Sequence, residues 1–172
     1  MCSAGRIWHP RGRVVRRQDV ENVWDYPRPP ALVPCARRVW IDFGGEPIAD
    51  STRALRVLET SHPPTVYVPI ADFAPGVLQP AARSSLCEFK GRASYLDVVA
   101  GDARADRAAW TYPSPTQPYA ALRDHVAVYP GRMDACRLDD ELVAAQHGDF
   151  YGGWITRELR GPFKGGAGTR RW

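Results

Sequence analysis

Lysine is rare in this chain, and both copies occur in the same tripeptide. Of the 23 basic residues only two are lysines, and they lie in Phe89-Lys90-Gly91 and Phe163-Lys164-Gly165. A lysine beside an aromatic ring and a glycine can bind a carboxylate or phosphate, and a desolvated lysine can act as a base or nucleophile. Chance placement in two turns after buried phenylalanines would give the same pattern. The repeated tripeptide therefore locates a candidate site and leaves the reaction open.

A second candidate is the segment 58–69, which holds the densest group of reactive side chains in the sequence. It contains a carboxylate at Glu59, hydroxyl groups at Thr60 and Ser61 and an imidazole at His62. Two prolines follow His62 and stiffen the backbone, which lowers the entropic cost of presenting the imidazole as a general acid or base. The alternative is structural: the hydroxyl groups satisfy turn amides, and His62 packs against a ring.

Familiar catalytic motifs give no further guidance. The sequence contains no G-x-S-x-G, H-E-x-x-H, G-x-x-x-x-G-K-[ST] or G-x-G-x-x-G motif. The stretch 161–169 is superficially similar to a phosphate loop, but its lysine precedes the glycine pair and no strand-to-helix context surrounds it. Its backbone amides could bind an anion, or the stretch could be a flexible terminal loop.

The cysteines do not predict a metal site, and no cofactor is expected. Cys2, Cys35, Cys87 and Cys136 are too far apart to form a C-x-x-C pair, so structural zinc is not predicted. Cys87 is the one thiol near a charged motif, and a single cysteine on a strand is typically a small core residue. No apolar run has signal-peptide or transmembrane length. We therefore expect a soluble cytoplasmic protein with free thiols and no membrane partner.

Charge and composition divide the chain into four segments. The net charge of +4 comes almost entirely from arginines near the N-terminus, and the remainder is balanced. We predict a basic, disordered arm over 1–20, a proline-rich extended segment over 21–36, a β core domain over 37–145 and a glycine-rich aromatic tail over 146–172. A short arginine arm is typical of a solvated terminus, so nucleic acid is not an expected partner. Exposed strand edges would permit a homo-oligomer, which no particular residue indicates.

Turn signals and β-branched residues predict a mainly β fold of short antiparallel strands. Gly44-Gly45 joins a hairpin of 38–43 and 46–49, and a second hairpin pairs 86–90 with 94–99, which places Lys90 at an exposed rim. Further strands are expected at 54–59, 66–68, 108–112 and 126–129, with a late hairpin at 137–143 and one short helix at 119–124.

Several multi-residue strings follow one another along the chain. They are Val23-Trp24-Asp25-Tyr26-Pro27-Arg28-Pro29-Pro30, Ala49-Asp50-Ser51, Leu58-Glu59-Thr60-Ser61-His62-Pro63-Pro64, Cys87-Glu88-Phe89-Lys90-Gly91, Ala109-Trp110-Thr111-Tyr112-Pro113, Phe150-Tyr151-Gly152-Gly153-Trp154-Ile155-Thr156 and Gly161-Pro162-Phe163-Lys164-Gly165-Gly166. In this order they resemble the domain of unknown function 427 family. The resemblance covers roughly 20–172, with the family's core domain at about 38–134 and the basic arm outside it.

The resemblance implies a β-tent-like fold, in which two antiparallel sheets meet at a steep angle, as in the thalidomide-binding domain of cereblon and in methionine sulfoxide reductase B. Many of those relatives carry a four-cysteine zinc site, which this sequence lacks. Their ligands often enter an aromatic groove on the sheet. Here the candidate ligand-binding residues are Trp24, Tyr26, Arg28, Tyr67, Tyr95, Trp110, Tyr112 and Lys164, and the candidate catalytic residues are Glu59, His62 and Lys90.

Two classes of function remain open on these residues. In the first, the protein binds a small acidic or carbonyl-containing metabolite in an aromatic-lined groove, where Lys90, with Arg28 or Lys164, neutralises the ligand. In the second, a metal-free enzyme acts on such a substrate. It would use His62 as acid or base and Lys90 as charge stabiliser or Schiff-base amine.

Family members are sometimes labelled nucleotidyltransferases, which gives a third alternative. Nucleotidyl transfer needs carboxylates that hold a divalent metal at the phosphates, commonly after a Gly-Ser turn. No Gly-Ser dipeptide occurs in the chain, and the acidic run 139–141 has the pattern of a solvated hairpin turn. Metal-dependent nucleotidyl transfer therefore ranks below the two pocket hypotheses.

Overall fold

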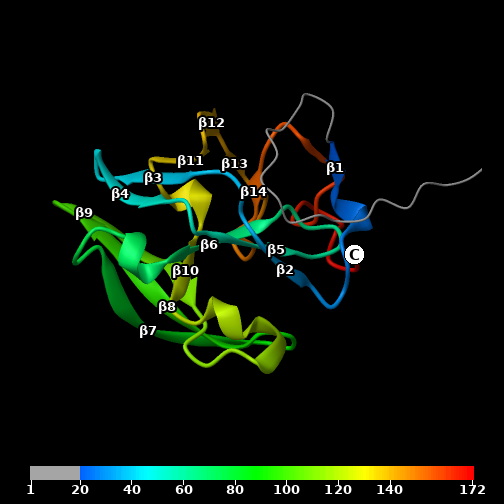
Figure 1. The fold of residues 1–172 in the computed structure, drawn as a ribbon, viewed down its shortest axis with the longest axis horizontal. Helices are drawn as coiled ribbons and strands as arrows, with labels where there is room; N and C mark the ends of the chain where they lie inside the picture. Colours follow the sequence, from blue (N-terminus) through cyan, green and yellow to red (C-terminus); the bar gives the residue numbers. More distant parts are fainter. Residues whose placement is uncertain (1–19) are drawn as a thin grey trace, which may run out of the picture.

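The computed structural model describes residues 20–172, which form a mainly β architecture (Figure 1). Its strands are β1 (Glu21–Asn22), β2 (Ala31–Pro34), β3 (Val39–Phe43), β4 (Glu46–Ser51), β5 (Leu55–Leu58), β6 (Thr65–Pro69), β7 (Leu78–Cys87), β8 (Gly91–Ala100), β9 (Ala103–Thr111), β10 (His125–Val128), β11 (Ala135–Leu138), β12 (Glu141–Leu142), β13 (Ala144–Ala145), β14 (Trp154–Ile155) and β15 (Leu159–Arg160). Short 3-10 helices lie between them: η1 (Val23–Asp25), η2 (Ile70–Asp72), η3 (Gln117–Leu122) and η4 (Pro130–Arg132). The basic arm predicted for 1–20 lies outside the described residues apart from Val20.

Two antiparallel sheets make up most of the fold. The larger sheet has the strand order β2-β5-β6-β10-β9-β8-β7, and the smaller has the order β12-β11-β3-β4. In Figure 1 the strands β3, β4 and β11 lie above β7 and β8, and the main apolar core contains residues of both sheets. The predicted mainly β class with two antiparallel sheets is confirmed. The short helix predicted at 119–124 is the 3-10 helix η3, which begins two residues earlier at Gln117.

The central strands of the seven-stranded sheet are buried on both faces, and their successive side chains point to opposite faces. Val66 and Val68 of β6 belong to the main core between the sheets, whereas Tyr67 between them belongs to a second cluster on the outer face. Strand β9 repeats this division, with Ala109 in the main core and Trp110 in the outer cluster. The sheet therefore has an aliphatic inner face and an aromatic outer face.

The hairpin of β7 and β8 turns at Glu88–Lys90, as the sequence predicts, but Lys90 is not exposed. Residues after β9 fold back over the turn, where Thr116 N–H donates to the Lys90 carbonyl at 3.1 Å and the Thr116 hydroxyl donates to the Phe89 carbonyl at 2.5 Å. The segment of η3 therefore covers the hairpin tip, and Lys90 is only 8% exposed. The prediction of an exposed rim lysine is wrong for this reason.

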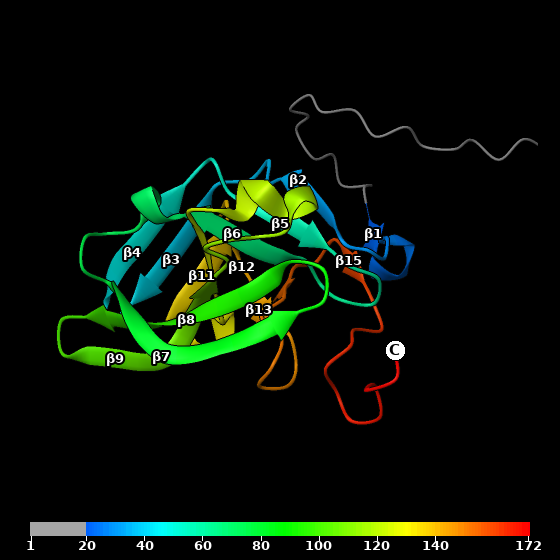
Figure 2. The same ribbon diagram turned by 90° about the horizontal axis from the view of Figure 1, so that it is seen from below.

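The proline-rich segment and the tail, predicted as extended chain and loop, both contain short strands. Strand β2 forms one edge of the seven-stranded sheet beside β5, and β1 pairs in parallel with β15 from the tail. Strand β14 pairs with β13. Beyond β15 the chain continues to the C-terminus along the edge of the molecule (Figure 2). Among the described residues, no helix has both the length and the apolar character needed to span a membrane.

Arg37 joins the hairpin of β11 and β12 to the tail. Its guanidinium contacts the carboxylates of Asp139 at 3.1 Å, Glu141 at 3.0 Å and Glu158 at 2.8 Å, and it donates to the Leu138 carbonyl at 2.6 Å. The Glu141 side chain is 12% exposed. Asp139 and Asp140 therefore form the exposed hairpin turn that the sequence predicts, whereas Glu141 is shielded by its contact with the partly buried Arg37.

Replacement of Arg37 should destabilise the fold. Arg37→Leu leaves the partly buried carboxylates of Glu141 and Glu158 without their partner, so we expect the free energy of unfolding to fall by about 2 kcal/mol. Urea denaturation followed by tryptophan fluorescence measures this value. The neighbouring Arg38 is a matched control, because its pair with Asp50 is solvent-exposed. Equal effects of Arg37→Leu and Arg38→Leu would contradict this account.

Candidate functional site

A cavity of about 470 Å³ lies on the outer face of the seven-stranded sheet, where the aromatic cluster meets the tail. It brings together side chains that are distant in the sequence, including most of those singled out above. These are Arg28, Glu59, His62, Tyr67, Lys90, Tyr95, Trp110, Tyr112 and Lys164. We call it the Lys90 cavity.

One wall of the Lys90 cavity is aromatic, because neighbouring strands place rings on the same face. Tyr95 of β8 is the direct partner of Trp110 of β9. Trp110 Nε1 donates a hydrogen bond to the Tyr67 hydroxyl at 3.1 Å, and their ring centres are 6.2 Å apart in an edge-to-face arrangement. Burial raises the pKa of Tyr67 and Tyr112, so both phenols are protonated at neutral pH.

The Lys90 side chain is largely buried, and its ammonium lies beside aromatic rings. Its ammonium lies 5.9 Å from the ring centre of Tyr112 and 6.0 Å from that of Tyr119, which are cation–π distances. Within residues 20–172 no carboxylate forms an ion pair with it. A buried charge in this state favours an anion that enters from the solvent.

The second lysine of the repeated tripeptide has other partners. Lys164 Nζ donates to the Trp172 carbonyl at 2.9 Å and lies 5.6 Å from the ring centre of Tyr151. The Lys164 backbone N–H donates to the Ser61 carbonyl at 2.8 Å. Lys164 therefore ties the tail to the segment of His62, in addition to lining the cavity.

A tight turn positions His62. The His62 N–H donates to the Glu59 carbonyl at 3.0 Å, and Ser61 adopts a left-handed conformation with φ 71°. The imidazole packs edge-to-face against Tyr151, with 4.7 Å between ring centres. The buried Nε2 atom has no hydrogen-bond partner in the described part of the chain. The turn thus presents one unsatisfied imidazole nitrogen beside the cavity.

Three cations surround this imidazole. Burial, together with the positive charges of Lys164, Arg28 and Lys90, lowers the pKa of His62 to about 4. The ring is therefore neutral at physiological pH and adds no charge to the cavity. Arg28 is compensated by Glu59, whose carboxylate lies 3.3 Å from its guanidinium.

Two predicted ligand-binding residues, Trp24 and Tyr26, do not line the cavity. Trp24 Nε1 donates to the Pro162 carbonyl at 2.9 Å, and its ring contacts that of Trp172 with 5.4 Å between centres. The Tyr26 hydroxyl donates to the Glu21 carboxylate. The Trp24 side chain thus attaches the N-terminal segment to the tail, whereas the Tyr26 hydroxyl binds within the N-terminal segment.

The tail contributes cavity residues that our sequence reasoning missed, namely Gln146, Tyr151 and Gly152. Gln146 Nε2 donates to the Lys164 carbonyl at 2.7 Å, and Gln146 Oε1 accepts from the Gly153 N–H at 3.0 Å. Tyr151 packs against the imidazole and the second lysine described above. The aromatic and glycine run at 150–154 is the sequence signal that could have revealed this contribution.

The two glycines of this run let the tail touch the aromatic wall directly. A Cβ at Gly152 would lie 2.3 Å from a ring carbon of Trp110, and a Cβ at Gly153 would lie 2.6 Å from Cγ of Pro63. Any larger residue would have to push one segment away from the other. The glycines therefore set the separation between the tail and the sheet.

The acidic run considered for nucleotidyl transfer lies apart from the cavity. Its members Asp139 and Glu141 contact Arg37, and neither lines the cavity. Within residues 20–172 no group of three or more His, Cys, Asp and Glu side chains is arranged to hold a metal ion.

Comparison with known families now gives the assignment. The model of a family described as a domain of unknown function, DUF427, matches residues 31–139. The chain belongs to the DUF427 family. This confirms the resemblance found from the sequence strings. The comparison with curated proteins finds no match.

The DUF427 match and the cavity have different extents along the chain. The matched region contains the aromatic wall, His62 and Lys90, whereas Arg28 and the tail residues lie outside it. The cavity of this DUF427 protein is therefore built jointly by the family domain and by the segments that flank it.

Substitution of Gly152 should weaken the packing of the tail against the Trp110 ring. We expect Gly152→Ala to lower the free energy of unfolding by about 1–3 kcal/mol, because the added methyl group overlaps the Trp110 ring. Urea denaturation measures the loss, and quenching of tryptophan fluorescence by acrylamide reports the exposure of the wall. Gly166→Ala is the matched control, since a Cβ there meets no atom within 4 Å. Equal stability of both variants would contradict the close contact.

The pKa of His62 gives a pH dependence of stability with a defined sign. Folding lowers this pKa from its ordinary value of 6.5 to about 4, so the unfolded chain binds more protons between these values. Stability is therefore complete above about pH 6.5 and is lost as the pH falls toward 4, by up to about 3 kcal/mol. His62→Gln, which cannot titrate, should lack this loss. Urea denaturation at several pH values between about 4 and 6.5 measures the free energy of unfolding of both proteins. If this free energy fell equally with pH in the unmodified protein and in His62→Gln, the assignment to His62 would be contradicted.

Proposed function

We propose that this DUF427 protein binds a small acidic or carbonyl-containing metabolite in the Lys90 cavity. The observation that carries the proposal is the largely buried Lys90 side chain, whose ammonium has aromatic neighbours and no carboxylate partner within residues 20–172. An apolar wall with a few convergent polar groups is typical of small-molecule sites. An anionic group of the ligand would supply the missing partner of Lys90.

His62 provides a second polar contact for such a ligand. Its Nε2 is buried without a partner among the described residues, so it can donate or accept one hydrogen bond according to its tautomer. A bound anion would offset the positive charges of Lys164, Arg28 and Lys90, and it would thereby raise the pKa of His62. Anion binding and proton uptake are therefore coupled in this proposal.

The unsatisfied Nε2 of His62 also supports a second function, metal-free catalysis on a substrate of the same class. His62 would act as acid or base, and Lys90 would stabilise charge or form a Schiff base. Glu59 contacts Arg28 and would hold that cation in place. A pKa near 4 makes the free imidazole a weak base, so binding is the first proposal and catalysis the second.

Lys90→Met tests the binding proposal, because it removes the charge and keeps most of the side-chain length. Thermal-shift measurements against keto acids, dicarboxylic acids, amino acids, and nucleotides with and without magnesium identify the strongest ligand, since a ligand of the native state raises the melting temperature. We expect an acid or carbonyl compound to bind. Calorimetry should show its affinity reduced about tenfold or more in Lys90→Met.

Arg123→Met is the control, since Arg123 is exposed and does not line the cavity. Equal affinity of Lys90→Met and the unmodified protein would overturn the proposal. Turnover lost in Lys90→Met with affinity kept to within about tenfold, or a borohydride-trapped adduct at Lys90, would favour catalysis. If only nucleotides with magnesium raised the melting temperature, nucleotidyl transfer would be favoured instead.

A further inference from the structure

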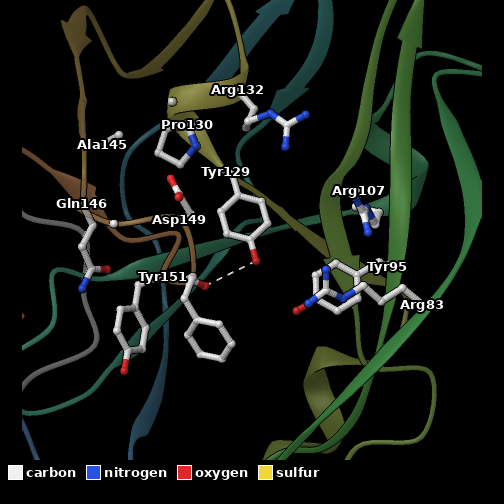
Figure 3. Close-up of a pocket in the computed structure, with 13 residues that line it drawn as sticks. Arg83, Tyr95, Arg107, Tyr129, Pro130, Arg132, Ala145, Gln146, Asp149 and Tyr151 are labelled. Carbon is white, nitrogen blue, oxygen red and sulfur yellow. Dashed lines mark hydrogen bonds between the residues drawn. The ribbon is translucent and has the colours of Figure 1, made fainter. Parts of the chain in front are cut away.

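A second cavity of about 300 Å³ adjoins the Lys90 cavity and contains three arginines, Arg83, Arg107 and Arg132 (Figure 3). We call it the arginine cavity. The Tyr129 hydroxyl, which donates to the Phe150 carbonyl at 3.4 Å, lies where the two cavities meet. The walls that the cavities share are formed by Tyr95, Tyr129, Gln146, Phe150 and Tyr151.

The backbone holds Arg107 in a conformation that is uncommon for a residue with a side chain. Its φ is 53°, at an irregularity in the pairing of β8 and β9. The carboxylate of Asp97, which is 6% exposed, accepts the Arg107 N–H at 2.7 Å and also pairs with Arg104. Bulges of this kind change the direction of a side chain, and positive φ in a non-glycine residue is often found at functional sites. A buried carboxylate thus fixes the bulge from which Arg107 reaches the cavity.

The other two arginines come from different elements. The Arg83 guanidinium of β7 lies 5.3 Å from the ring centre of Tyr95 (Figure 3). Arg132 is the last residue of η4, three residues after Tyr129.

The arginine cavity carries an excess of positive charge. Arg83, Arg107 and Arg132 are exposed side chains, and within residues 20–172 no carboxylate forms an ion pair with any of them. Asp149 supplies the one carboxylate in the lining. Guanidinium groups donate pairs of hydrogen bonds that match the oxygens of phosphate. Three of them from three elements fit a dianionic group better than a single carboxylate.

We propose that the ligand is elongated, with its acidic or carbonyl group at Lys90 and a phosphate group in the arginine cavity. This inference rests on the proposed function and narrows its ligand to a small phosphorylated acid or carbonyl compound. The shared tyrosine and phenylalanine side chains would contact the part of the ligand that joins the two ends. No single-ended anion would satisfy both sets of cations.

A homologous series of ω-phosphonoalkanoic acids tests this inference, because each member carries a carboxylate and a phosphonate at opposite ends. Calorimetry compares every member with the alkanoate and the alkylphosphonate of the same length. We expect one chain length to bind about a hundredfold more tightly than either single-ended compound, since the second group then binds without a further loss of freedom.

Variants assign each end of this probe. Arg107→Gln should lower the affinity for the tightest-binding ω-phosphonoalkanoic acid about tenfold, and it should leave the affinity for the alkanoate of the same length unchanged. Arg132→Gln, on an exposed 3-10 helix, provides the same test without touching the β-bulge. Arg92→Gln is the control, because Arg92 lies on the same sheet and lines neither cavity.

The outcomes separate the two proposals. Alkanoates that bind at Lys90 without any gain from the phosphonate would overturn the inference and leave the proposed function intact. The inference would also be overturned if the phosphonate still increased the affinity in both Arg107→Gln and Arg132→Gln. Absence of binding by alkanoates, diacids and alkylphosphonates alike would overturn both proposals. If the affinity gained from the phosphonate were lost in Arg107→Gln and Arg132→Gln but kept in Arg92→Gln, the phosphate site in the arginine cavity would be established.

Discussion

Because alternate side chains of β6, β9 and β10 point to opposite faces, the seven-stranded sheet has two apolar surfaces that must be removed from water. The four-stranded sheet covers the aliphatic surface. The aromatic surface has no second sheet, and it is covered by η3 and by segments from the two ends of the described chain. Irregular segments fill space less completely than a packed sheet does. The Lys90 cavity is the space left between a regular wall and an irregular cover.

This arrangement also explains the electrostatics of the cavity. The cover brings Arg28 and Lys164 toward His62, and the hairpin tip under η3 brings Lys90. Aromatic rings accommodate the ammonium of Lys90, but they do not neutralise it as a carboxylate would. The imidazole stays uncharged in response. The fold therefore keeps a positive field inside an apolar enclosure, which is a common arrangement for the selective binding of anions.

Local patterns in the sequence predicted the sheet class and the hairpins, because these depend on turn residues and on alternation along single strands. The aromatic wall was expected from the family resemblance. Local patterns also indicated His62, Lys90 and the other cations as one site. The burial of Lys90 and the contribution of Gln146 and Tyr151 could not be predicted in this way. Both depend on segments that fold back over the sheet from far along the chain, and no local periodicity encodes that contact. The arginine cavity depends likewise on a bulge held by a buried aspartate.

Gln146 joins parts of the tail to one another and makes no hydrogen bond to the aromatic wall within the described residues. Its amide group binds Gly153 on one side and Lys164 on the other, and Lys164 in turn binds Ser61. The last part of the tail is held by these hydrogen bonds and by the contacts of Trp24 with Pro162 and Trp172, whereas Trp154 is anchored in the main core. Opening this part would break those bonds while both apolar clusters stay packed. Under the proposed function, opening of the tail and global unfolding would have separate free energies, so a ligand would enter without disruption of either apolar cluster.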